Sequence, residues 1–133
     1  SNICRNYKLL TSIKGVGPIT AIVMLCSTLN FTKITDHRKF ACYCGLAPFE
    51  HSSGTSVRGG CHTSSMANRD IKVQLNRSAL IAIRCDPQLK AYYERKVAEG
   101  KHKFSVLNAV RAKIAARCFA VVRRGTPYVA LQI

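Results

Sequence analysis

Apolar residues recur every three to four positions over most of the chain, the spacing that one face of an α-helix produces. Glycine and proline interrupt these runs, and both residues commonly mark helix ends. The pattern predicts an all-α fold, with helices at about 5–13, 18–29, 36–44, 67–85, 87–99 and 105–124.

Four of these helices carry apolar stripes that are expected to face a common core. In the first and second helices the stripes are Leu9, Leu10 and Ile13, then Ile19, Ile22, Val23, Cys26 and Leu29. In the long helix and the last one they are Ile71, Leu75, Ala79 and Ala82, then Leu107, Val110, Ile114, Cys118 and Val121.

The segment at about 46–65 interrupts the helical pattern and holds glycines at positions 54, 59 and 60. We expect a long Ser/Gly-rich loop there, inside a single domain that covers residues 1–133. The chain begins with Ser1-Asn2 and lacks an initiator Met, so we expect it to be a piece of a longer protein.

The net charge of the chain indicates what kind of partner it binds. The chain has 21 Lys and Arg against 6 Asp and Glu, a formal net charge of +15. Such an excess attracts a polyanion, and nucleic acid is favoured over an anionic membrane surface. Neither a membrane-spanning run nor a signal peptide is visible, so we expect a cytoplasmic protein without a membrane partner.

The seven cysteines are scattered and odd in number, which favours thiols in a reducing cytosol over a disulfide framework. Cys42 and Cys44 with Cys61 and His62 resemble a zinc site only loosely, because the first pair lacks the usual spacer. We therefore expect no metal in this chain, and buried or half-buried cysteines.

The turn Gly15-Val16-Gly17-Pro18 fits a helix-hairpin-helix spanning about 5–29. Glycines allow close approach of a phosphate, and the start of the second helix offers free N–H groups. The candidate phosphate contacts are Lys14, Gly15, Gly17 and Thr20, whose hydroxyl is a further possible donor. A simple turn between two helices is the alternative.

Ser53 in the loop is a candidate nucleophile, followed by Gly54, which gives a phosphodiester room. Arg58 would neutralise phosphate oxygens, and His51 or Glu50 would move protons. An ordinary polar loop, in which serine and glycine are turn residues, is the alternative.

The six carboxylates are dispersed over separate predicted elements, at Asp36, Glu50, Asp70, Asp86, Glu94 and Glu99. A two-metal nuclease needs several carboxylates converging on its ions. If the chain acts on DNA, either the serine does the covalent work or the metal lies elsewhere.

The last helix presents Arg111, Lys113 and Arg117 as candidate nucleic-acid contacts. Tyr92 and Tyr93, near Arg95 and Lys96, either stack on bases or pack their helix against its neighbours. The sequence alone favours packing.

Three segments in order resemble a known family, the Piv/MooV-type transposases and invertases of insertion-sequence family 110/116/902. They are Gly15-Val16-Gly17-Pro18-Ile19-Thr20-Ala21, Phe40-Ala41 through Gly45-Leu46-Ala47-Pro48, and Ser53-Gly54-Thr55-Ser56-Val57-Arg58-Gly59. The tail from Asn108 to Tyr128 fits as well, so the resemblance covers nearly the whole chain.

The resemblance implies a C-terminal domain whose catalytic serine falls on Ser53. That serine attacks a DNA phosphodiester and forms a covalent phosphoserine link. It further implies a separate N-terminal RuvC-like domain with four metal-binding acids and Mg²⁺, a homo-oligomer, and a guide-type RNA from the element. The isolated domain is then expected to bind nucleic acid without recombining it.

Two features depart from the family pattern. Many relatives have Lys-Arg-Gly-Asn before the long helix, where this chain has Ser65-Met66-Ala67-Asn68. Ser52 also offers a neighbouring hydroxyl. Two rival functions stay open: a non-catalytic helix-hairpin-helix module, and a structural RNA-binding protein that uses charge alone.

Overall fold

The computed structural model describes residues 2–44 and 65–129, and every regular element within them is a helix. This confirms the all-α prediction. The predicted loop at 46–65 lies, apart from its last residue, outside the described ranges. The helices are α1 (Asn2–Thr11), α2 (Pro18–Ser27), α3 (His37–Tyr43), α4 (Ser65–Cys85), α5 (Pro87–Ala98) and α6 (Lys103–Arg124).

Side-chain caps fix several helix starts. Asp36 accepts a hydrogen bond from the Arg38 N–H at 3.1 Å and begins α3. Nδ1 of His102 accepts one from the Phe104 N–H at 3.1 Å, which explains why α6 begins at Lys103, earlier than expected. Such caps satisfy amides that have no partner inside the helix.

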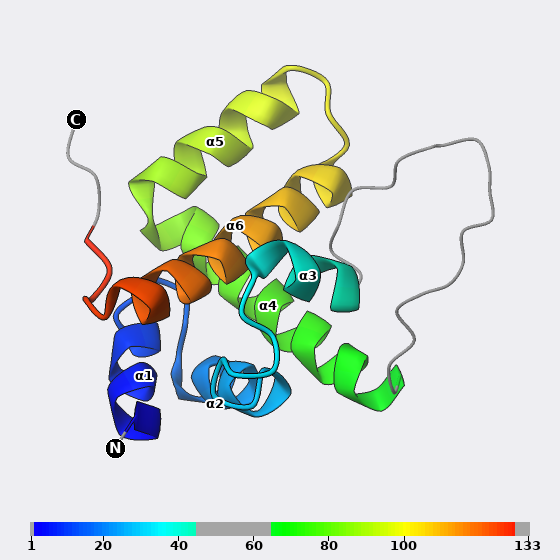
Figure 1. The fold of residues 1–133 in the computed structure, drawn as a ribbon. Helices are drawn as coiled ribbons and strands as arrows, with labels where there is room; N and C mark the ends of the chain where they lie inside the picture. Colours follow the sequence, from blue (N-terminus) through cyan, green and yellow to red (C-terminus); the bar gives the residue numbers. More distant parts are fainter. Residues whose placement is uncertain (1, 45–64, 130–133) are drawn as a thin grey trace.

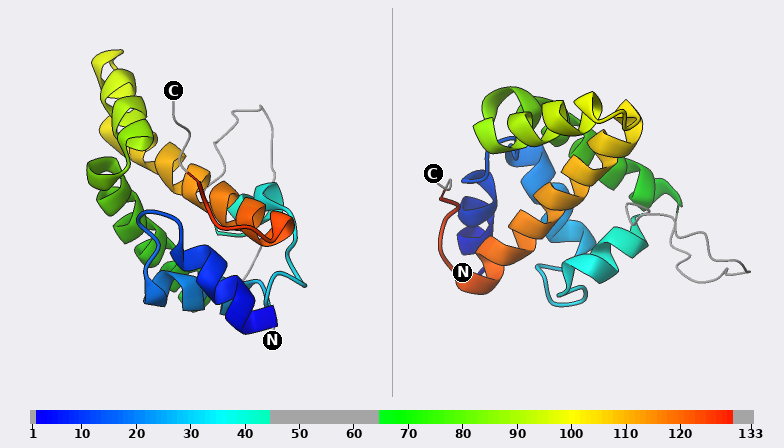
Figure 2. Two further views of the ribbon diagram at one scale, coloured as in Figure 1. Left: turned by 90° about the vertical axis from the view of Figure 1, so that its left-hand side faces the viewer. Right: turned by 90° about the horizontal axis from the view of Figure 1, so that it is seen from above.

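Helix α6 runs through the middle of the molecule, as Figures 1 and 2 show. It packs against α1, α3, α4 and α5, while α4 also packs against α2 and α5 (Figure 1). Since α6 contacts four other helices, it is the element around which the described part of the fold is assembled.

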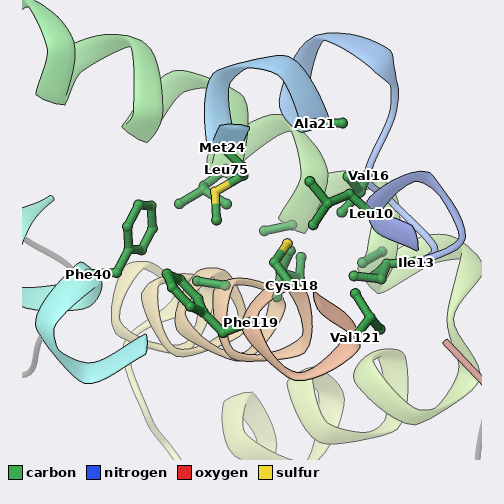
Figure 3. Close-up of a cluster of buried hydrophobic side chains, with 14 of the residues drawn as sticks. Leu10, Ile13, Val16, Ala21, Met24, Phe40, Leu75, Cys118, Phe119 and Val121 are labelled. Atoms are coloured by element: carbon green, nitrogen blue, oxygen red, sulfur yellow. The ribbon is translucent and has the colours of Figure 1, made fainter. Parts of the chain in front are cut away.

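The core gathers around α6 (Figure 3), where Cys118, Phe119 and Val121 meet side chains from the other helices. Phe119 forms an edge contact with Phe31 at 4.9 Å between ring centroids and lies 5.4 Å from Phe40. Edge-to-face and tilted aromatic pairs of this kind add to the stabilisation from burial.

The apolar stripes of three helices are confirmed. The predicted core residues of α4 and the first helix are all buried, and those of α6 are buried except for half-buried Leu107.

The predicted stripe of α2 is wrong. Ile19, Ile22 and Leu29 are 59%, 51% and 57% exposed, whereas Thr20, Ala21 and Met24 are buried. Because α2 is apolar nearly all round, its periodicity does not determine which face packs.

Small side chains determine the packed face instead. The Thr20 and Ser78 hydroxyls lie 3.0 Å apart between α2 and α4. Gly15, at φ +96°, lies so close to α4 that a Cβ there would be 2.7 Å from the Ser78 carbonyl oxygen. A larger residue at either place would separate the two helices.

The turn after α2 contains three consecutive residues with left-handed backbone, Leu29, Asn30 and Phe31. The Thr28 hydroxyl accepts from the Phe31 N–H at 2.9 Å and donates to the Met24 carbonyl at 2.7 Å. Asn6 donates to the Asn30 side chain at 2.8 Å. These hydrogen bonds stabilise a left-handed backbone conformation that is otherwise unfavourable. This conformation places the Phe31 ring against Phe119.

Replacing Gly15 by alanine should lower the free energy of unfolding by about 2–4 kcal/mol, since it adds positive-φ strain to a backbone clash. Gly17→Ala is the matched control, because no atom lies within 4 Å of the added Cβ and φ is −97°. Urea denaturation followed by circular dichroism measures both. Equal stabilities for the two variants would contradict the packing role of Gly15.

Candidate nucleic-acid interface

The turn between α1 and α2 presents part of the predicted phosphate site at the surface. Lys14 is exposed, and Gly17 precedes the first turn of α2 in open space. The Ala21 N–H bonds to the Gly17 carbonyl at 3.0 Å, so the Ile19 and Thr20 amides come before this bond. These are the amide positions of a helix start that attract anions.

The other two predicted contacts face inward. The Thr20 hydroxyl is buried against Ser78, which corrects the expectation that it is a donor at the surface. Gly15 packs against α4 at Ser78 and Ala82. Small residues at these two positions are needed for the packing of α2 against α4. The backbone N–H of Thr20, and not its hydroxyl, is therefore the group that would contact a phosphate.

The predicted nucleophile lies outside the described residues. Ser53, Gly54 and Arg58 fall within 45–64, as do the candidate proton carriers Glu50 and His51. Their assignment rests on the sequence alone.

The structure separates the three basic residues predicted on α6. Lys113 and Arg117 line a groove with α5, whereas Arg111, two positions from Lys113, points elsewhere. Arg111 is half-buried, its Nε has no hydrogen-bond partner within the described structure, and burial lowers the pKa of its guanidinium. Burial that leaves the Nε hydrogen unbonded makes the charge of Arg111 costly in free energy.

The groove between α5 and α6 has a volume of about 500 Å³. Gln88, Tyr92 and Arg95 line it from α5, and Lys113 and Arg117 from α6. Lys113 Nζ lies 4.6 Å from the Tyr92 ring centroid, and Arg95 Cζ lies 5.7 Å from it. The groove thus combines an aromatic ring with positive charge, two features that suit nucleic acid.

Arg117 is fixed in this groove by a buried carboxylate. Its Nη1 lies 2.6 Å from Asp86 Oδ2, and its Nη2 donates to Gln88 Oε1 at 3.0 Å. Asp86 is only 2% exposed and also caps α5, accepting from the Gln88 and Leu89 amides at 2.9 and 3.3 Å. The sequence alone identifies Asp86 only as one of six dispersed carboxylates, because its partner Arg117 lies 31 positions away.

Burial alone would raise the pKa of Asp86. The hydrogen bond and positive charge of Arg117, together with the two amide bonds, outweigh burial and hold that pKa below its ordinary value. Asp86 therefore stays ionised at neutral pH and compensates the charge of Arg117.

The described ranges contain no group of three side chains able to hold a metal ion, and none of their helices has the length and apolar character needed to cross a membrane. The expectation of buried cysteines is wrong for Cys4, Cys26, Cys42 and Cys85, which are exposed. Burial raises the pKa of the Cys118 thiol to about 12, so it stays protonated.

Comparison with known proteins now defines the class to which this basic helical domain belongs. The model of the transposase IS116/IS110/IS902 family matches residues 7–94, about two thirds of the chain. The chain belongs to this transposase family.

Two individual relatives support the same family assignment. An uncharacterised 43.6 kDa protein of insertion element IS110 from Streptomyces coelicolor is 39% identical over 90% of this chain and 29% of its own length. The pilin gene-inverting protein of Moraxella lacunata is 26% identical over 92% of this chain and 39% of its own length. The chain therefore spans roughly a third of the length of these relatives.

Asp86→Asn should lower the free energy of unfolding by about 1–3 kcal/mol at pH 7, because it keeps an acceptor for the cap but removes the charge facing Arg117. Urea denaturation measures it. Asp36→Asn is the control, since Asp36 caps α3 without an ion pair in the described residues, and it should change stability by less than about 0.5 kcal/mol.

The pH dependence follows from the lowered pKa of Asp86. Its contribution is complete above the unfolded aspartate pKa of about 3.9 and is lost as the pH falls through the lower folded value. The stability gap between the wild type and Asp86→Asn should therefore narrow below about pH 4. A gap that stays constant into strong acid would contradict the ionised pair.

Proposed function

We propose that this chain is the serine-bearing domain of a DNA transposase or site-specific recombinase. The observation that carries the proposal is the family match over residues 7–94, which includes both the turn between α1 and α2 and the Ser53 loop. The net charge of +15 supports a nucleic-acid substrate.

In the proposed reaction the Ser53 hydroxyl attacks a DNA phosphorus atom. A bond from Oγ to phosphorus forms, and the bond from phosphorus to the departing DNA oxygen breaks. His51 or Glu50 takes the serine proton, and the departing oxygen acquires a proton to become a hydroxyl. The phosphoserine link conserves the phosphodiester energy, so a second strand can be joined without an external energy source.

The turn between α1 and α2 would position the DNA without reading its sequence. Lys14 and the amides at the start of α2 would contact a backbone phosphate, with Gly17 leaving it open to approach. Gly54 would give the reacting phosphate room, and Arg58 would neutralise its oxygens.

The Mg²⁺ expected of the family does not fit the residues described here. Asp86 is committed to Arg117, and Asp36 caps α3. We therefore place the metal-binding acids in a RuvC-like domain outside this chain, so that the active site is composite, and we assign no step to the metal here.

The whole protein would act in the bacterial cytoplasm, associated with the nucleoid when bound to DNA. We further propose that it works as a homo-oligomer and uses a guide-type RNA from its element. The matched relatives from Streptomyces coelicolor and Moraxella lacunata are bacterial proteins, which supports the bacterial setting alone.

Ser53→Ala in the full-length protein should abolish recombination and the covalent protein–DNA link, with a loss of roughly a thousandfold or more. Radiolabelled DNA that migrates with the protein in a denaturing gel measures the link. The matched control is Ser52→Ala, which removes the neighbouring hydroxyl and should keep the link.

Unchanged recombination by Ser53→Ala would reduce this serine to a loop residue and favour a non-catalytic nucleic-acid-binding module. Strand exchange by residues 1–133 alone, without added protein or metal, would contradict the composite site.

A further inference from the structure

A second hollow adjoins the groove between α5 and α6. It has a volume of about 280 Å³ and shares Gln88 and Arg117 with the first. Tyr128 and Arg124 line its far side. Because two lining residues are common to both, the hollows adjoin along α6 as one depression, which the hydrogen bond between Arg117 and Gln88 divides.

Each hollow holds one tyrosine beside a cation. Tyr92 lies under Lys113 in the first, and the Arg117 guanidinium lies 4.8 Å from the Tyr128 ring centroid in the second. The backbone N–H of Tyr128 donates to the Ser12 hydroxyl at 2.9 Å, which ties this residue to the turn after α1. Each hollow thus presents one aromatic ring.

The charge of this depression is largely uncompensated. Arg95, Lys113 and Arg124 are exposed and have no carboxylate within ion-pair distance among the described residues, whereas Arg117 is paired with Asp86. Lys113 and Arg124 are 11 positions apart on α6, a rise of about 16 Å. Positive charge therefore extends over several nucleotide lengths.

We infer that the two hollows bind a single-stranded stretch of nucleic acid, with Tyr92 and Tyr128 as stacking platforms for bases and Arg95, Lys113 and Arg124 as phosphate contacts. Alternating aromatic rings and cations in a groove are the features that single strands require. A paired duplex keeps its bases stacked on each other and cannot offer their faces to these rings.

Lys113 supports this choice of ligand. Its ammonium lies over the Tyr92 ring, yet its side chain is exposed to solvent. A base can displace it from the ring while it stays within reach of the adjoining phosphate. A packed apolar side chain in the same place would block stacking.

This inference specifies the nucleic acid bound in the proposed function, but it does not depend on Ser53 chemistry. The test is fluorescence anisotropy with the 133-residue chain and three labelled probes: oligo(dT), oligo(U) and a DNA duplex of equal length. The dT and U probes distinguish a DNA strand from an RNA strand as the natural ligand.

Tyr92→Leu should weaken binding of at least one single-stranded probe by roughly 5- to 100-fold, while Tyr92→Phe retains it. Tyr93→Leu is the matched control, since Tyr93 does not line either hollow. Duplex binding should change by less than about twofold. Circular dichroism checks that each variant keeps its helices.

If Tyr92→Leu unfolds the protein, a variant at an exposed residue still tests the inference. Lys113→Gln should weaken single-strand binding more than Lys90→Gln, which removes an equal charge from an exposed position of α5 outside the hollows. Equal effects of these two variants would overturn the inference, as would full competition by polyglutamate of equal charge. Absence of the covalent link between Ser53 and DNA would contradict the recombinase proposal but not this inference.

Discussion

The hydrogen-bonded ion pair between Asp86 and Arg117 connects three helices. Asp86 lies between α4 and α5, caps α5, and holds an arginine of α6 at 2.6 Å. A buried carboxylate is tolerated because charge and amide donors surround it. Without this pair the junction of α4 and α5 would lose its charged contact with α6, and Arg117 would be left with the neutral hydrogen bond to Gln88.

The ion pair distinguishes two kinds of basic residue in this region. Arg117 is neutralised and structural, while Arg95, Lys113 and Arg124 keep their charge available at the surface. A fixed guanidinium also orders Gln88 and the ring of Tyr128. The domain thus places two aromatic rings beside solvent-exposed cations along α6, the features from which we infer strand binding without readout of base sequence.

The helices and most of the core could be predicted from the sequence, because α4 and α6 alternate apolar and polar faces clearly. The packed face of α2 could not, since Ile19 and Ile22 are as apolar as the side that packs, and the small residues Gly15 and Thr20 decide the geometry. Nor could the groove, whose walls come from segments about 20–40 positions apart. The nucleophile at Ser53 rests on motif order, which the described residues do not test.

Photo-crosslinking shows whether the hollows along α6 hold a nucleic-acid strand. A single-stranded oligonucleotide with bromouracil or thiouracil bases is irradiated on the protein, and the modified peptides are located by mass spectrometry. Adducts are expected on the peptides that contain Tyr92 and Tyr128. Efficient crosslinking confined to other peptides would contradict it.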